Sequence, residues 1–135
     1  MVKKIALEEH FLCPGFEDYW KTTVGDIDPN ILGRLVGRLS DFGDLRLEAM
    51  DQAGISRAVL SLSGPGVQIE RDTATARRRA REANDFLARE VQKHPGRYSG
   101  FAHLPMQDAV AAADELDEVT MSSARSIPVV VCVVV

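Results

Sequence analysis

The feature that most constrains the fold of this chain is an alternation of short apolar segments with longer segments of helical periodicity. Three segments have the apolar character of buried strands: residues 4–7 (KIAL), 57–62 (RAVLSL) and 98–104 (YSGFAHL). Apolar side chains recur at helical spacing over 31–53 and 72–93, and another helix is predicted from Gln107 to Leu116. Strands separated by such helices pair in parallel through right-handed crossovers. The pattern predicts an α/β fold, either a doubly wound sheet or part of a (β/α)8 barrel.

Local signals set the expected ends of these elements. Asp44 is predicted to cap the second half of the 31–53 segment, and Gly54 is predicted to end it. The tripeptide at 94–96 (HPG) is predicted to end the long helix. Residues 11–30 are interrupted by prolines and glycines, and we expect an irregular loop there. A loop of this length in a compact domain is either functional or evidence against the assignment, and we interpret it as functional.

Composition and charge restrict the classes of partner. The chain has 135 residues, 45% of them hydrophobic and 27% charged, which suits one packed domain. Its formal net charge of -4 gives no sign of the basic surface that binds nucleic acid, and we expect neither a nucleic-acid nor a membrane partner. The arginines between Arg77 and Arg81 are expected on a solvated helix face. Cys13 and Cys132 form no CxxC pair, and no signal peptide is recognised, so we expect a cytoplasmic protein.

The sharpest chemical feature is the pair Glu8 and His10 after the first strand segment. Residues two apart in a strand point to the same side, and at the carboxyl end of a first barrel strand that side faces the active site. A carboxylate and an imidazole are suitable ligands for a divalent metal ion. The alternative is that both side chains are simply solvated at a strand end. An ExH pair is a weak motif by itself.

Three further residues are candidates for substrate binding. His103 lies near the end of the third strand segment, although a strand histidine is more often a hydrogen-bonded structural group. Ser63 opens the loop SGPG after the second strand segment, where a plain βα turn is the competing interpretation. Trp20 and its aromatic neighbours suit an aromatic-substrate pocket, and they suit packing within the loop as well.

Several blocks of this sequence, taken together and in order, resemble the N-terminal part of the amidohydrolase-related decarboxylases. They are KIALEEHF at 4–11, RLEAMDQAG at 46–54, LSLSGPGVQ at 60–68, AND at 83–85 and PGRYSGFAHLPMQ at 95–107. The resemblance covers residues 3 to about 116 and is most specific for the gamma-resorcylate (2,6-dihydroxybenzoate) type. It implies the N-terminal part of a (β/α)8 barrel.

The resemblance also implies a site and a reaction. Glu8 and His10 match the first-strand metal ligands of the family, and the metal is one divalent ion, zinc or manganese. The implied substrate is a small aromatic carboxylic acid. Protonation of the ring carbon that bears the carboxylate breaks aromaticity, and loss of CO2 restores it. The intact enzyme is expected to be a homo-oligomer.

The end of the chain departs from the family pattern. We divide the chain into a barrel segment at 1–116 and a divergent tail at 117–135, whose valine-rich end (IPVVVCVVV) has the profile of a buried strand or an aggregation-prone segment. A full barrel takes about 250 residues, so we expect a truncated or frameshifted and inactive form, whose catalytic residues lie elsewhere. The alternatives are a metal-dependent hydrolase of the same superfamily and a non-catalytic fragment that self-associates.

Overall fold

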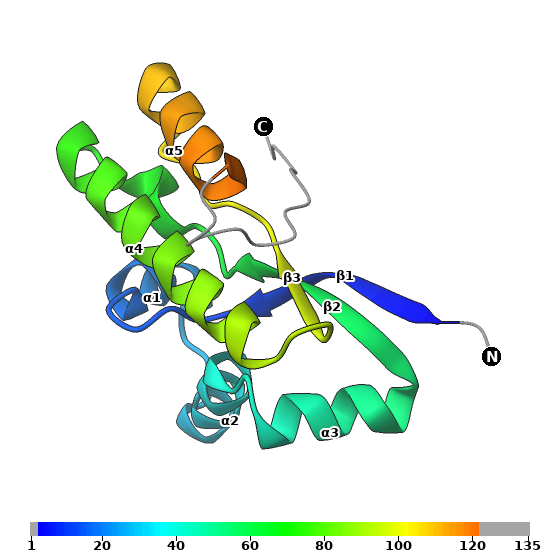
Figure 1. Ribbon diagram of the computed structural model, residues 1–135. Coiled ribbons are helices and arrows are strands. Elements are labelled where there is room, and N and C mark those ends of the chain that lie inside the picture. Colours follow the sequence, from blue (N-terminus) through cyan, green and yellow to red (C-terminus); the bar gives the residue numbers. More distant parts are fainter. Residues whose placement is uncertain (1–2, 122–135) are drawn as a thin grey trace.

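A computed structural model describes residues 3–121 of the chain (Figure 1). Its sheet has three parallel strands in the order β1-β2-β3, with a helical connection between each strand and the next. The elements are, in order, β1 (Lys4–Phe11), α1 (Glu17–Val24), α2 (Pro29–Ser40), α3 (Asp44–Ala53), β2 (Ile55–Leu62), the 3₁₀ turn η1 (Gly66–Ile69), α4 (Thr73–Lys93), β3 (Tyr98–Gly100) and α5 (Ala109–Met121). The predicted α/β class and parallel pairing are confirmed.

Four aromatic side chains form the centre of the core between the sheet and the helices. The Phe42 ring lies 5.6 Å from the Phe11 ring, 5.5 Å from the Phe86 ring and 6.1 Å from the Tyr98 ring, all edge-on. These contacts join β1, the turn before α3, α4 and β3. Edge-to-face pairs of this kind add to the gain from burying apolar area. The Tyr98 hydroxyl donates a hydrogen bond to the Phe42 carbonyl oxygen at 2.7 Å, so the one polar group in the cluster has a partner.

Helix α4 packs on the sheet through small side chains. Its buried face is formed by residues at helical spacing: Ala76, Ala80, Ala83, Asn84, Leu87, Ala88 and Val91. Alanines let the helix approach the strands closely, and the Asp72 carboxylate caps the first turn by accepting from the Thr75 amide at 2.8 Å. Helix α5 lies beside α4 (Figure 1), and Arg81 joins the two helices through ion pairs to Glu115 and Glu118.

Other arginines of the α4 run are also less solvated than predicted. Arg79 lies over the Phe16 ring, 5.5 Å from its centroid, and its side chain is only 30% exposed. The Arg78 and Arg79 side chains both pair with Glu82. The expectation of a simply solvated basic face therefore holds only in part.

The segment 11–30 was predicted to be irregular, and this prediction is wrong for α1. Trp20 is buried and Phe16, just before the helix, is 2% exposed, so contacts with the rest of the fold stabilise a helix of eight residues. A helix this short is not stable by itself in water, which is why its local sequence signal is weak. Helix α2, in contrast, has a strong start: Asp28 accepts from two backbone amides and Pro29 is its first residue.

Three other boundaries differ from the prediction or refine it. The residue before α3 is Gly43, so Asp44 does not cap the helix; Asp41 instead accepts from the Arg46 amide at 2.8 Å. Gly54 ends α3 in the left-handed conformation, at φ 68°, as predicted. The third strand is shorter than predicted, because pairing with β2 stops at Gly100 and residues 101–105 are irregular.

The predicted division at 116 stays a prediction. Helix α5 continues through this position to Met121, and the valine-rich segment and Cys132 lie outside the described residues. No helix within residues 3–121 combines the length and the apolar character that crossing a lipid bilayer requires.

The two tyrosines provide a matched test of the core. Tyr98→Phe is expected to lower the free energy of unfolding by about 1–2 kcal/mol, because the buried Phe42 carbonyl loses its donor. Tyr19→Phe removes a hydroxyl that donates to Glu70 at 2.8 Å on the half-exposed side of the fold, and should cost less. Urea unfolding of both variants and the parent chain measures the difference. An equal or larger loss for Tyr19→Phe would contradict the assignment of Tyr98 to the core.

Candidate functional site

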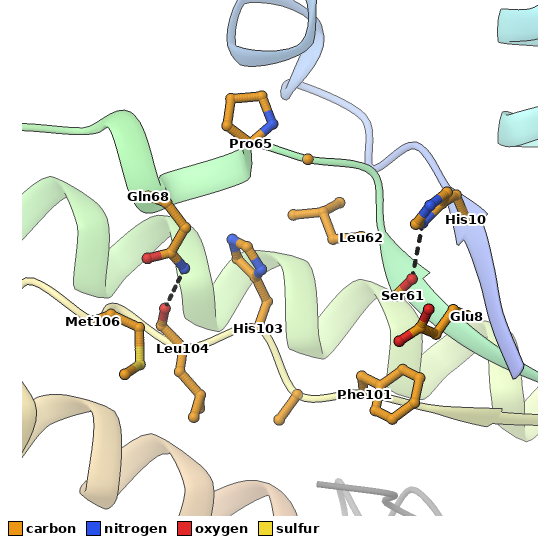
Figure 2. A pocket seen from close by; sticks show the side chains of 12 residues that line it. Glu8, His10, Ser61, Leu62, Pro65, Gln68, Phe101, His103, Leu104 and Met106 are labelled. Atoms are coloured by element: carbon orange, nitrogen blue, oxygen red, sulfur yellow. Dashed lines mark hydrogen bonds between the residues drawn. The ribbon is translucent and has the colours of Figure 1, made fainter. Parts of the chain in front are cut away.

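A pocket opens at the carboxyl ends of the three strands, where polar and apolar side chains meet (Figure 2). Its volume is about 510 Å³, which is within the range of small-molecule sites and large enough for a single substituted ring. The lining residues come from β1, from β2 and its following loop, and from the segment after β3: Glu8, His10, Ser61, Leu62, Gly64, Pro65, Gln68, Phe101, Ala102, His103, Leu104 and Met106.

Glu8 lies in the pocket because the first strand is distorted there. The pairing of β1 with β2 shifts register between Ala6 and Glu9, so a β-bulge interrupts the strand. Within the described residues Glu8 is the non-glycine residue with a positive φ, 59°. This conformation disfavours any side chain with a Cβ and is found preferentially at functional sites. The predicted side-by-side placement of Glu8 and His10 is therefore present, but simple strand alternation does not produce it.

His10 is oriented from two sides. Its Nδ1 lies 2.9 Å from the Ser61 hydroxyl oxygen on the neighbouring strand, where Ser61 is its partner in the β1–β2 register (Figure 2). The Arg46 guanidinium donates to the His10 carbonyl at 2.9 Å and to the Asp41 carbonyl at 2.8 Å. A histidine that ligates a metal characteristically uses its other ring nitrogen in such a bond. In the tautomer whose Nδ1–H donates to Ser61, Nε2 of His10 is the available ligand atom.

His103 is held in the middle of the pocket by the Val67 backbone amide and the Asn84 side chain. Its Nε2 accepts from the Val67 amide at 3.0 Å. The Asn84 side chain binds both backbone groups of the same residue, accepting from the His103 amide at 2.8 Å and donating to its carbonyl at 2.9 Å. Burial lowers the pKa of the His103 imidazole to about 4, so the ring is neutral near pH 7.

The loop after β2 is fitted closely to His103. Gly66 has φ 55°, and a Cβ at this position would lie 2.5 Å from His103 Nε2. Only glycine therefore allows η1 to approach the imidazole. The Gln68 amide donates to the Leu104 carbonyl at 2.9 Å, and the Gln107 amide donates to the Val67 and Glu70 carbonyls. These bonds join the loops after β2 and β3 into one wall of the pocket.

The pocket brings together some of the residues predicted from the sequence and not others. Glu8, His10 and His103 line it. Ser63 lies beside it, where its amide donates to the Phe11 carbonyl at 2.9 Å and continues the β1–β2 pairing. Trp20 is 6% exposed and belongs to the core on α1, as the packing alternative predicted. Neither Ser63 nor Trp20 is among the lining residues, and their role in substrate binding stays a prediction.

Sequence reasoning missed other residues of the site. Ser61 contacts His10, but finding it requires the strand register, which the sequence does not provide. Asn84 was visible as a polar residue within the apolar stripe of the long helix, which is a signal for a specific buried partner. Gln68 and Phe101 carry no signal of their own.

The donor atoms available for a metal ion are few. In residues 3–121, no group of three or more histidine, cysteine, aspartate or glutamate side chains is close enough together to hold a metal ion. The Glu8 carboxylate and His10 Nε2 are chemically suitable for zinc or manganese, and they provide two ligands where a catalytic zinc site usually has three from protein. The described residues thus fit part of a metal site.

The strain at Glu8 is measurable. Glu8→Gly is expected to change the free energy of unfolding by less than about 1 kcal/mol, because relief of the backbone strain offsets the extra freedom of glycine in the unfolded chain. Glu9→Gly, at the next residue, lacks this relief and should cost about 1 kcal/mol. Thermal unfolding of both variants gives the comparison, and an equal loss for the two variants would argue against a strained Glu8.

Curated relatives match most of the chain, although no protein-family model matches it. Gamma-resorcylate decarboxylase of Polaromonas sp. is 46% identical over 114 residues, covering 84% of this chain and 34% of the relative. Gamma-resorcylate decarboxylase of Rhodococcus jostii is 44% identical over 116 residues, covering 86% of this chain and 34% of the relative. The chain thus spans about a third of the length of these relatives.

Solved structures of such decarboxylases also match the fold of this chain. A dihydroxybenzoic acid decarboxylase from Polaromonas sp., with bound manganese and the inhibitor 2-nitroresorcinol, matches with a TM-score of 0.82 and 43% identity over 90% of this chain and 36% of that chain. A 2,6-dihydroxybenzoate decarboxylase complexed with 2,6-dihydroxybenzoate matches with a TM-score of 0.82 and 41% identity over 90% and 37% of the two chains.

These structures decide between the two architectures that the strand pattern left open. They are TIM barrels of the amidohydrolase type, and the three parallel strands described above correspond to a part of them. By sequence and by fold, this chain is a relative of the amidohydrolase-type decarboxylases of aromatic acids, and it matches an N-terminal portion that makes up about a third of their length.

Proposed function

We propose that this chain provides part of the active site of a metal-dependent, non-oxidative decarboxylase of hydroxylated aromatic acids. The observation that supports this best is the pocket that Glu8 and His10 share, with Ser61 occupying Nδ1 of His10 and leaving Nε2 free. The relatives that match are gamma-resorcylate decarboxylases, and one of the solved structures holds manganese. We infer a carboxy-lyase that acts in the cytoplasm on a small dihydroxybenzoate.

The described residues have three roles in this proposal. Glu8 and His10 Nε2 would hold a divalent ion, which when bound would supply Lewis-acid chemistry to the substrate carboxylate. Leu62, Phe101 and Leu104 supply apolar walls for the ring. Arg46 holds the backbone carbonyl of His10, and Ser61 holds its imidazole ring.

The bond changes need one proton. It adds to the ring carbon that bears the carboxylate, the carbon–carbon bond then breaks, and its electron pair returns to the ring as CO2 leaves. We assign no acid for this step within residues 3–121. His103 is unsuited to it, because its imidazole carries only one proton near neutral pH and its Nε2 is occupied.

The metal assignment can be tested on the chain itself. Glu8→Gln and His10→Gln are each expected to weaken Mn²⁺ binding at least about 10-fold, measured by electron paramagnetic resonance of the free ion, since each removes one of two ligands. Glu48→Gln and His94→Gln remove the same kinds of group away from the pocket and should leave binding unchanged. Mn²⁺ binding that survives in Glu8→Gln and His10→Gln would exclude the assigned ligands.

The activity is tested by release of CO2 from 2,6-dihydroxybenzoate with Mn²⁺ present, with benzoate as the comparison substrate. The proposal predicts that activity follows the presence of the whole barrel, so the chain alone should be far slower than a protein of the relatives' full length. Hydrolysis of an ester or lactone without CO2 release would support the hydrolase alternative.

An observation also favours self-association as a second candidate. Within residues 3–121 β1 is an edge strand, and its residues Ile5 and Leu7 are 59% and 65% exposed. An apolar edge strand invites pairing with another chain. Leu7→Lys is expected to shift the sedimentation of the chain toward the monomer, while Leu45→Lys, at an equally exposed apolar residue on α3, should not. A parent chain that is monomeric at all concentrations would remove this candidate.

A further inference from the structure

His103 and His10 present different ring nitrogens to a ligand: Nε2 of His103 is already bonded, whereas in His10 the bonded nitrogen is Nδ1. An amide can only donate, so the bond from the Val67 amide at 3.0 Å requires that His103 Nε2 carry no proton. In the neutral ring the proton is then on Nδ1. Within residues 3–121, the Nδ1–H group has no hydrogen-bond acceptor.

The position of the ring makes the Nδ1–H group of His103 available to a ligand in the pocket. The imidazole lies between Gln68 on one side and Leu62, with Glu8 and His10 beyond it, on the other (Figure 2). Its Nε2 edge is covered by Gly66 and Val67. A hydrogen-bond donor in a mainly apolar pocket is costly to leave without a partner, and it selects for ligands that supply an acceptor.

A chain of hydrogen bonds behind the ring fixes its position. Asn84 binds the amide and the carbonyl of His103, and its second N–H donates to the Glu115 carboxylate at 3.0 Å. Glu115 in turn accepts from the Arg81 guanidinium at 3.2 Å. These residues lie on α4 and α5, so the packing of the two helices determines where the imidazole lies. A rigid donor of this kind is what binding specificity requires.

We propose that His103 is a neutral hydrogen-bond donor of this pocket, whose Nδ1–H binds an oxygen atom of an aromatic acid held beside Glu8 and His10. This inference rests on the proposed function, and it specifies the side of the site opposite the metal ligands. His103 then acts as a specificity-determining residue, and neither as a metal ligand nor as the acid of the reaction. Burial alone lowers the pKa of the His103 imidazole, and no charged group contributes to the shift.

The proton position can be measured directly. The chain has only three histidines, so long-range ¹H–¹⁵N correlation spectra of ¹⁵N-histidine protein are assignable with His10→Gln and His94→Gln. His103 should show the Nδ1–H tautomer, and the ring should stay neutral on lowering the pH from 8 to 5. Addition of 2,6-dihydroxybenzoate with Zn²⁺ should shift the His103 Nδ1–H proton. A proton on Nε2, or a signal that does not respond to the acid, would overturn the inference.

Two variants separate the two nitrogens. In His103→Gln the side-chain amide reaches the position of Nε2, where its oxygen can accept from Val67, but the donor at Nδ1 is lost. Its affinity for 2,6-dihydroxybenzoate should fall about 10-fold, which corresponds to one bond to a charged or phenolic oxygen. In His103→Asn the amide reaches the position of Nδ1 and keeps the donor, so binding should stay within about 3-fold. Equal affinity of His103→Gln and the parent chain would overturn the inference.

The outcome is separable from that of the proposed function. A response at His103 without CO2 release from any form of the enzyme supports the donor and counts against the decarboxylase. CO2 release with no response at His103, and with full affinity in His103→Gln, supports the decarboxylase and counts against the donor.

Discussion

The parallel pairing of β1 with β2 is the interaction on which the rest of the structure depends. It brings the carboxyl ends of two strands to one edge, and its register sets His10 opposite Ser61. The same pairing is interrupted by the bulge that turns Glu8 into the pocket. A slip of one residue would move every side chain of β1 to the other face of the sheet. The register therefore determines the candidate metal ligands as much as the residues themselves do.

The sequence predicted the class and order of the elements because these depend on periodicity and on local end signals. Gly54 and the HPG tripeptide ended helices as predicted, since both signals act through the backbone of their own segment. Helix α1 and the early end of β3 at Gly100 were not predicted, because the burial of Trp20 and the extent of pairing with β2 are long-range effects. Local patterns contain no information about such contacts.

The candidate site, like the fold, was predictable only where the signal lies within one segment of the sequence. Glu8 and His10 were found through residue type and spacing, although the bulge shows that the reasoning from strand alternation was incomplete. Predicting the contact of Ser61 with His10 requires the strand register. Predicting the hydrogen bonds of Asn84 to His103 requires the packing of α4 against the segment after β3. Residues that contact a ligand directly are often visible in a sequence, while those that orient them are rarely so.

The two histidines of the pocket show how one side-chain type obtains two different chemistries. His10 Nδ1 contacts the Ser61 hydroxyl, and in the tautomer that donates this bond the Nε2 lone pair is available to a cation. His103 uses the lone pair of Nε2 for the Val67 amide, so what remains is a proton on Nδ1, available to an anion or a phenol oxygen. A hydroxylated aromatic acid at a metal site presents oxygen atoms in both directions. The partner that each histidine binds behind the pocket thus decides which end of such a ligand it can hold.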